Sequence, residues 1–157
     1  MKSNYLKYWR VVRQYARRKW DLSDAELDVL LFMYDENYFS RDRFEEYERV
    51  LHWDSKRFKR MLRDGWITVF RPRVGNQKTL YQLSLKSAQV VDFIYEKLNH
   101  SVPFPAIPRR KHYITRLKMG ERTYRYSDKM YRAMIDEMNE IAEAERLKRQ
   151  QQRPAQG

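Results

Sequence analysis

A short basic segment holds the residues of this sequence whose types and spacing could most clearly do chemistry. Five of the eight residues from Lys56 to Arg63 are Lys or Arg. An Arg guanidinium can donate two parallel hydrogen bonds to phosphate or to the O6 and N7 atoms of guanine, whereas a Lys ammonium mostly supplies charge to phosphate. The spacing of Phe58, Met61 and Leu62 predicts one apolar stripe on a short helix, with the cations on its outward and flanking faces. The segment therefore indicates contact with a polyanion.

A second basic cluster follows in a predicted β-hairpin. Residues 66–70 and 79–83 are rich in β-branched and aromatic side chains, and Gly75-Asn76 between them favours a tight turn. The tip of this hairpin carries Arg71, Arg73 and Lys78. A solvated helix face and an ordinary soluble loop are the plainer interpretations of the two clusters. Five cations on eight residues nevertheless repel one another unless an anion offsets them.

The composition of the whole chain also indicates an anionic partner. Its 157 residues hold 33 Lys and Arg against 21 Asp and Glu, a net charge of +12, which favours nucleic acid ahead of anionic lipid. The charge is uneven, since residues 1–20 carry +7 and residues 21–48 carry −8. The lack of cysteine excludes disulfides and thiolate metal sites, and no apolar run approaches the roughly 18 residues of a membrane helix. A soluble intracellular protein with one main core is expected.

Periodicity and capping residues predict the helices that position these clusters. A 3.6-residue period predicts a first helix over about 4–19. A capping box at Ser23 begins a second helix that runs to about Tyr34. Ser40 can cap a third helix over about 41–51, whose glutamates largely face water.

The basic helix and its successor have equally local signals. Asp54 is the expected N-cap of a helix from Ser55 to Asp64, and Gly65 can supply its left-handed C-terminal cap. After the hairpin, Ser84 can cap a fifth helix that ends near Leu98. The basic helix therefore buries one narrow stripe and exposes the rest.

Composition divides the chain into three predicted parts. Residues 1–100 form a domain with an N-terminal helix, residues 101–126 a Pro-containing basic linker, and residues 127–157 a C-terminal helix with a frayed tail. The coiled-coil-like spacing of the last helix rests on Tyr131, Met134, Met138 and Ile141.

The order of elements from Leu22 to Leu98, about half of the chain, resembles the winged helix-turn-helix domain of MarR-type transcription regulators. The local matches are Leu22–Leu31 (LSDAELDVLL), Arg63–Ile67 (RDGWI), the Arg-containing hairpin, and Leu83–Ser87 (LSLKS) opening a helix. The basic helix is about a turn shorter than is usual in the family, and Arg71-Pro72-Arg73 stands where an Asp-x-Arg is typical. The resemblance is therefore to a divergent, phage-encoded branch.

This resemblance implies that the basic helix enters a DNA major groove and that the hairpin lies as a wing along the backbone or minor groove. The predicted DNA-binding residues are Ser55, Lys56, Arg57, Lys59, Arg60, Arg63, Arg71, Arg73 and Lys78. Arg57 and Arg60 are expected to contact bases. The resemblance also implies a homodimer formed through the N- and C-terminal helices. The residues alone leave open whether the aromatic face of the first helix meets a second copy or its own domain.

Other chemistries have little support in the sequence. His52, His100 and His112 show no metal-ligand spacing, and the chain has no Gly-rich phosphate loop or nucleophile motif. No metal, cofactor or enzymatic activity is therefore expected. Aromatic rings could stack on unpaired bases of RNA or single strands, but most rings lie in apolar stripes, which favours a role in the core.

The sequence thus predicts a mainly α protein with a small β-hairpin wing, a winged helix-turn-helix with a C-terminal helical extension. The expected function is binding of double-stranded DNA and regulation of transcription in the cytoplasm. The alternative is a phage structural or assembly protein, carried in the virion, that uses the same fold and its C-terminal arm to bind a phage or host protein.

Overall fold

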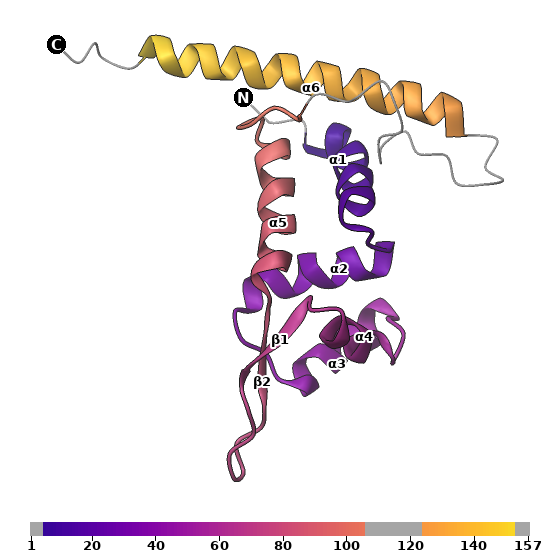
Figure 1. Ribbon diagram of the computed structural model, residues 1–157, viewed down its shortest axis with the longest axis vertical. Helices are drawn as coiled ribbons and strands as arrows, with labels where there is room; N and C mark the ends of the chain where they lie inside the picture. The colour runs from indigo at the N-terminus through magenta and orange to yellow at the C-terminus, as the bar shows by residue number, and fades with distance from the viewer. Residues whose placement is uncertain (1–4, 106–123, 153–157) are drawn as a thin grey trace. The chain divides into compact units, whose positions relative to one another are not determined.

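Helices make up most of the computed structural model, and one antiparallel β-hairpin accompanies them (Figure 1). The structure describes residues 5–105 and 124–152. In chain order the elements are α1 (Tyr5–Trp20), α2 (Asp24–Met33), the 3-10 helix η1 (Tyr34–Glu36), α3 (Arg41–Leu51), α4 (Arg57–Arg63), β1 (Ile67–Arg71), β2 (Leu80–Leu83), α5 (Leu85–Leu98) and α6 (Tyr124–Gln152). The predicted class, mainly α with a small hairpin, is confirmed. Within the described ranges, no helix is both long and apolar enough to cross a membrane.

The chain forms two compact units. One is Leu22–Asp92, and the other joins Met1–Asp21 to Phe93–Gly157. The predicted domain of residues 1–100 differs from this grouping, because α1 belongs with α6 and the end of α5 rather than with α2, α3 and α4. Most of the predicted linker, residues 106–123, lies outside the described residues.

Side-chain caps fix the starts of α2 and α3. Ser23 Oγ accepts the backbone N–H of Glu26 at 3.1 Å, and Glu26 Oε1 accepts the N–H of Ser23 at 3.4 Å, which completes a capping box. Ser40 Oγ accepts the N–H of Arg43 at 3.3 Å. Both caps are those that the sequence predicts, and each such cap contributes about 1 kcal/mol to stability.

Aromatic rings form the centre of the core in Leu22–Asp92. Phe58 of α4 meets Phe44 of α3 edge-on, with ring centroids 4.9 Å apart, and meets Tyr81 of β2 edge-on at 4.8 Å. Buried side chains of α2 complete this core: Leu27, Val29, Leu30 and Met33. Because Phe58 and Met61 are both buried, the orientation of α4 about its own axis is fixed.

The segment before α3 also pairs with the hairpin through its backbone. β1 and β2 are antiparallel, with Val69 opposite Tyr81. Tyr81 also exchanges two backbone hydrogen bonds, of 2.9 and 2.8 Å, with Phe39. The hairpin is thereby attached at its base to the segment between α2 and α3, and its tip extends beyond α3 in Figure 1.

Two irregularities shape the hairpin. Phe70 is an extra residue between Val69 and Arg71 in the pairing with β2, which makes a β-bulge. At the tip, Val74 and Gln77 pair around Gly75-Asn76, and Gly75 has a φ of +57°. A glycine with positive φ as the first central residue is the pattern of a two-residue II′ turn, in agreement with the predicted tight turn.

In the other unit, α1 buries one complete face. Its nearly inaccessible side chains are Tyr8, Val11, Val12, Tyr15 and Ala16. The hydroxyl of Tyr8 and the ammonium of Lys7 both donate to Glu137 Oε1 of α6, at 2.5 and 2.9 Å. Tyr8 and Tyr15 of the aromatic face of α1, which the MarR resemblance assigns to a dimer contact, are therefore covered within the single chain, whereas Tyr5 remains exposed.

The first residues of the predicted linker are packed. The ring of Phe104 is only 4% exposed, its backbone N–H donates to Asn139 Oδ1 of α6 at 2.7 Å, and its carbonyl accepts from Asn139 Nδ2 at 3.4 Å. The buried ammonium of Lys97 donates to the carbonyls of Val102 and Pro103, each at 3.2 Å. Residues 101–105 therefore belong to this unit, which corrects the prediction of an extended linker there.

Candidate nucleic-acid interface

The basic helix begins two residues later than the sequence predicts. The carboxylate of Asp54 accepts the N–H of Lys56 at 2.9 Å, and its backbone carbonyl accepts the N–H of Arg57 at 2.9 Å. These two hydrogen bonds stabilise a turn at Ser55 and Lys56, and α4 begins only at Arg57. Because the same Lys56 N–H hydrogen bond favours the ionised carboxylate, the pKa of Asp54 lies below its ordinary value.

The end of α4 follows the prediction. Gly65, with a φ of +81°, donates to the carbonyl of Leu62 at 3.2 Å, and Trp66 donates to the carbonyl of Met61 at 2.9 Å. This pair of hydrogen bonds is a Schellman motif, which stops a helix at a residue with positive φ. The chain leaves α4 here and enters β1, so the basic helix and the hairpin are joined by a short, well-defined turn.

Most of the basic helix is open to solvent. Phe58 and Met61 point into the core, as the sequence predicts. The exposed polar residues of the segment are Ser55, Lys56, Lys59, Arg60 and Arg63. An anion approaching α4 therefore meets four cations before it meets any apolar side chain of the helix.

Arg57 does not share this exposed face. Its side chain is 15% exposed, and its guanidinium Nη1 lies 4.0 Å from Glu26 Oε1 of α2. Its Nε is buried and makes no hydrogen bond within the described chain. The expectation that Arg57 contacts bases is therefore corrected, because the later start of α4 leaves this residue beside α2.

Arg60 and Arg63 are paired, but only on the surface. Arg60 Nη2 lies 2.8 Å from Asp54 Oδ2, and Arg63 Nε lies 3.2 Å from Asp64 Oδ1. All four side chains are substantially exposed. Exposed ion pairs contribute little to stability and exchange readily with other partners, so both guanidinium groups remain available to a phosphate or a base.

The hairpin cations differ in accessibility. Arg73 is exposed and donates only a long hydrogen bond, 3.4 Å, to the carbonyl of Gly75. Lys78 is exposed and forms an ion pair with Asp42 of α3. Arg71 is half-buried, with a buried Nε that lacks a partner among the described atoms. No Asp or Glu occurs from residue 65 to residue 91, so the hairpin supplies no acidic residue of its own to offset its positive charge.

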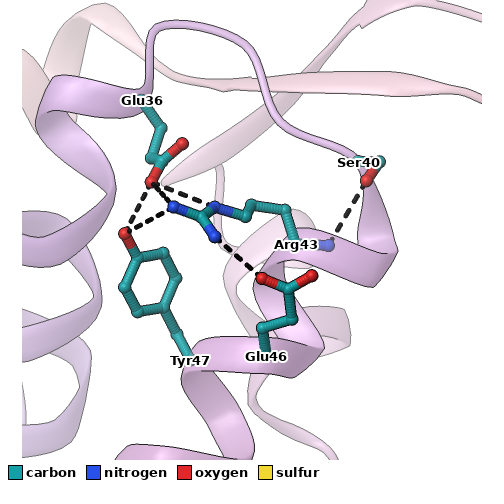
Figure 2. Close-up of polar contacts among 5 residues, drawn as sticks. All are labelled: Glu36, Ser40, Arg43, Glu46 and Tyr47. Carbon is teal, nitrogen blue, oxygen red and sulfur yellow. Dashed lines mark hydrogen bonds and ion pairs between the residues drawn. The ribbon is translucent and has the colours of Figure 1, made fainter.

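Arginines of α3 pair with three acidic side chains of η1 and α3, namely Glu36, Glu45 and Glu46. Figure 2 shows Arg43 between two carboxylates, with Nη2 3.0 Å from Glu36 Oε1 and Nη1 2.7 Å from Glu46 Oε2. The hydroxyl of Tyr47 also donates to Glu36 Oε1. Hydrogen bonds from Tyr47 and Arg43 lower the pKa of Glu36. The hydrogen bond between Tyr47 and Glu36 in turn raises the pKa of Tyr47.

Sequence reasoning missed this network and described the acids of the third helix as facing water. Glu36 and Arg43 are seven residues apart and meet only because the segment between η1 and α3 turns back. The network fixes α3 to that segment.

No metal or cofactor site is evident in the described residues. Within these ranges, no three His, Cys, Asp or Glu side chains are grouped so that they could hold a metal ion. His52 is exposed, His100 is buried, and His112 lies outside the described residues.

Comparison with known proteins gives no further guidance on this interface. No model of a protein family matches the chain, and neither does any curated protein or any solved structure. The function is therefore argued from the residues and the geometry alone.

Proposed function

We propose that Leu22–Asp92 is a winged helix-turn-helix unit that binds double-stranded DNA through α4 and the hairpin. The observation that carries the proposal is the exposed cationic face of α4, whose opposite side is anchored by Phe58 and Met61. The element order supports it, because α2, the Phe39 pairing, α3, α4 and the hairpin follow one another as in a winged helix-turn-helix. The acid-free hairpin adds a second positive surface in the same unit.

The dimensions of α4 suit a major groove. An α-helix with its side chains is about 10–12 Å in diameter, and the major groove of B-DNA is about 12 Å wide. Arg60 is then the side chain for guanine recognition, while Lys56, Lys59 and Arg63 contact phosphates on either side. Arg73 and Lys78 contact the backbone or the minor groove, and Lys78 exchanges its pair with Asp42 for a phosphate.

Regulation of transcription in the cytoplasm is the biological role that this interface supports. In a homodimer, the contact would use exposed residues of α6 such as Leu147, since Tyr8 and Tyr15 of α1 are already buried. Light scattering with size separation tests this point. A Leu147→Glu variant should run as a monomer if α6 mediates the contact, and a dimer that survives the change contradicts it.

A gel-shift selection from random duplexes at two salt concentrations tests duplex binding. We expect retention of most duplexes at low salt, through phosphate contacts, and enrichment of a subset at higher salt, through base contacts. A protein that retains no duplex at low salt would refute the proposal.

A second candidate function is a phage structural or assembly role. The observation that favours it is the last third of α6, where residues 143–152 are all exposed although they remain helical. Deletion of residues 143–157 should then abolish assembly and leave duplex binding intact. Deletion from residue 101 would be uninformative, because it would remove Phe104, Ile135 and Met138 from the core.

A further inference from the structure

Two aromatic rings lie stacked on the surface near the base of the hairpin. The rings of Tyr38 and Phe70 have centroids 3.9 Å apart and an interplanar angle of 22°. Tyr38 is 50% exposed and Phe70 is 46% exposed. The stacked rings Tyr15 and Phe93, by contrast, are buried in the other unit. The rings of Tyr38 and Phe70 therefore stack nearly parallel to each other, while about half of each side chain remains exposed to water.

The backbone presents these two rings for a local reason. Phe70 is the extra residue of the β-bulge, and a bulge redirects a side chain out of the regular alternation of a strand. Tyr38 precedes Phe39, whose side chain is buried and whose backbone pairs with Tyr81. Because neighbouring residues in an extended segment point to opposite faces, burial of Phe39 directs Tyr38 outward.

The surroundings of the pair are cationic. Arg71 and Arg73 follow Phe70 directly in the chain, and the whole stretch from residue 65 to residue 91 lacks acidic residues. The nearest acid of the preceding segment, Glu36, is engaged by Arg43 and Tyr47. A planar aromatic surface beside cations has the chemistry that binds an unpaired nucleobase together with its phosphate.

We infer that the Tyr38–Phe70 pair, called here the aromatic platform, stacks with an unpaired nucleobase next to the duplex held by α4. This inference rests on the proposed function and adds to it a preference for duplexes with a single-stranded end or opening. The geometry of the pair is compatible with this role, because its two rings are nearly parallel and a base stacked on the platform would continue the same stack. Aromatic side chains that the sequence assigned to the core thus include two with a binding role.

The test compares three labelled DNA ligands by fluorescence anisotropy with the full chain. They are a blunt duplex, the same duplex with a short adenine overhang, and the same duplex with an abasic overhang of equal length. The abasic overhang keeps the phosphates and removes the bases. We expect the adenine overhang to bind roughly 5- to 150-fold more tightly than the abasic one, as one stacked base provides.

The double variant Tyr38→Leu with Phe70→Leu should lose this difference and keep its affinity for the blunt duplex. Phe32→Leu is the matched control, because Phe32 is also 46% exposed in the same unit but lies outside the platform. Thermal unfolding followed by circular dichroism establishes that all variants fold. Equal affinity for adenine and abasic overhangs, or a double variant that retains the difference, overturns the inference alone. Failure of the wild type to bind the blunt duplex overturns the proposed function as well.

Discussion

Replacing Lys59, Arg60 and Arg63 together by Gln should change the salt dependence of duplex binding by a calculable amount. The exposed cations of the proposed interface are Lys56, Lys59, Arg60, Arg63, Arg73 and Lys78. Each phosphate neutralised by such a group contributes about −0.9 to the slope of log affinity against log salt. Arg60 is assigned to guanine, so about five phosphate contacts predict a slope of about −4.5 for the wild type, and the three that remain in the triple variant predict a slope of about −2.7.

The difference is large enough to measure by anisotropy titrations between 50 and 200 mM salt. Over that range, the wild type should lose about 500-fold in affinity and the variant only about 40-fold. The variant should unfold at nearly the same temperature, since Arg60 and Arg63 form only exposed ion pairs.

A matched control exists on α6. Arg146, Lys148 and Arg149 are again two Arg and one Lys, all exposed, so their replacement by Gln removes the same charge from a surface outside α4 and the hairpin. Because they flank Leu147, light scattering must first establish that this control keeps the oligomeric state of the wild type. Its slope should remain that of the wild type. Equal slopes for the two triple variants would refute the reasoning, because the response would then report net charge rather than contacts of α4.

Three further predictions concern stability. Phe104→Ala should lower the free energy of unfolding in urea by about 3–5 kcal/mol, because it empties a buried aromatic site, and a loss below about 1 kcal/mol would contradict that packing. Ser23→Ala should cost about 1 kcal/mol through loss of the α2 cap, whereas Ser55→Ala, at a residue that caps no helix, should cost almost nothing; equal effects would argue against the cap. Burial lowers the pKa of His100 below 6.5, so the unfolded chain takes up a proton that the folded chain resists, and stability should fall as the pH drops below about 6.5 and level off below the folded pKa. His100→Asn, which tolerates the φ of +54°, should flatten this dependence in urea titrations from pH 7.5 to 5.5, and an unchanged pH profile would exclude His100 as its source.

Features with local causes could be predicted from the sequence. The caps at Ser23 and Ser40 depend on side chains three residues from their targets, and the stop at Gly65 depends on one residue that accepts positive φ. The turn at Gly75-Asn76 has the same character. Three cations predicted to lie outward on α4, Lys59, Arg60 and Arg63, do so, because the inward stripe of Phe58 and Met61 fixes the helix.

Features that depend on distant partners could not be predicted in this way. Arg57 is on the basic helix by sequence, yet its environment is set by Glu26, 31 positions earlier in the chain. Phe104 stands between prolines, which are typical of a linker, but Asn139 of α6 satisfies its backbone. The exposure of Phe70 follows from a bulge, which has no clear signature in an aromatic, β-branched strand.

The continuous helix α5 has a consequence for how this chain can change. Leu85–Asp92 serves one unit and Phe93–Leu98 serves the other, with no loop at the junction. A single residue inserted between Phe93 and Ile94 would rotate every later side chain of the helix by about 100° relative to Phe93, turning Ile94 away from the position in which it is buried. Tolerated insertions in this part of α5 should therefore be confined to multiples close to whole helical turns.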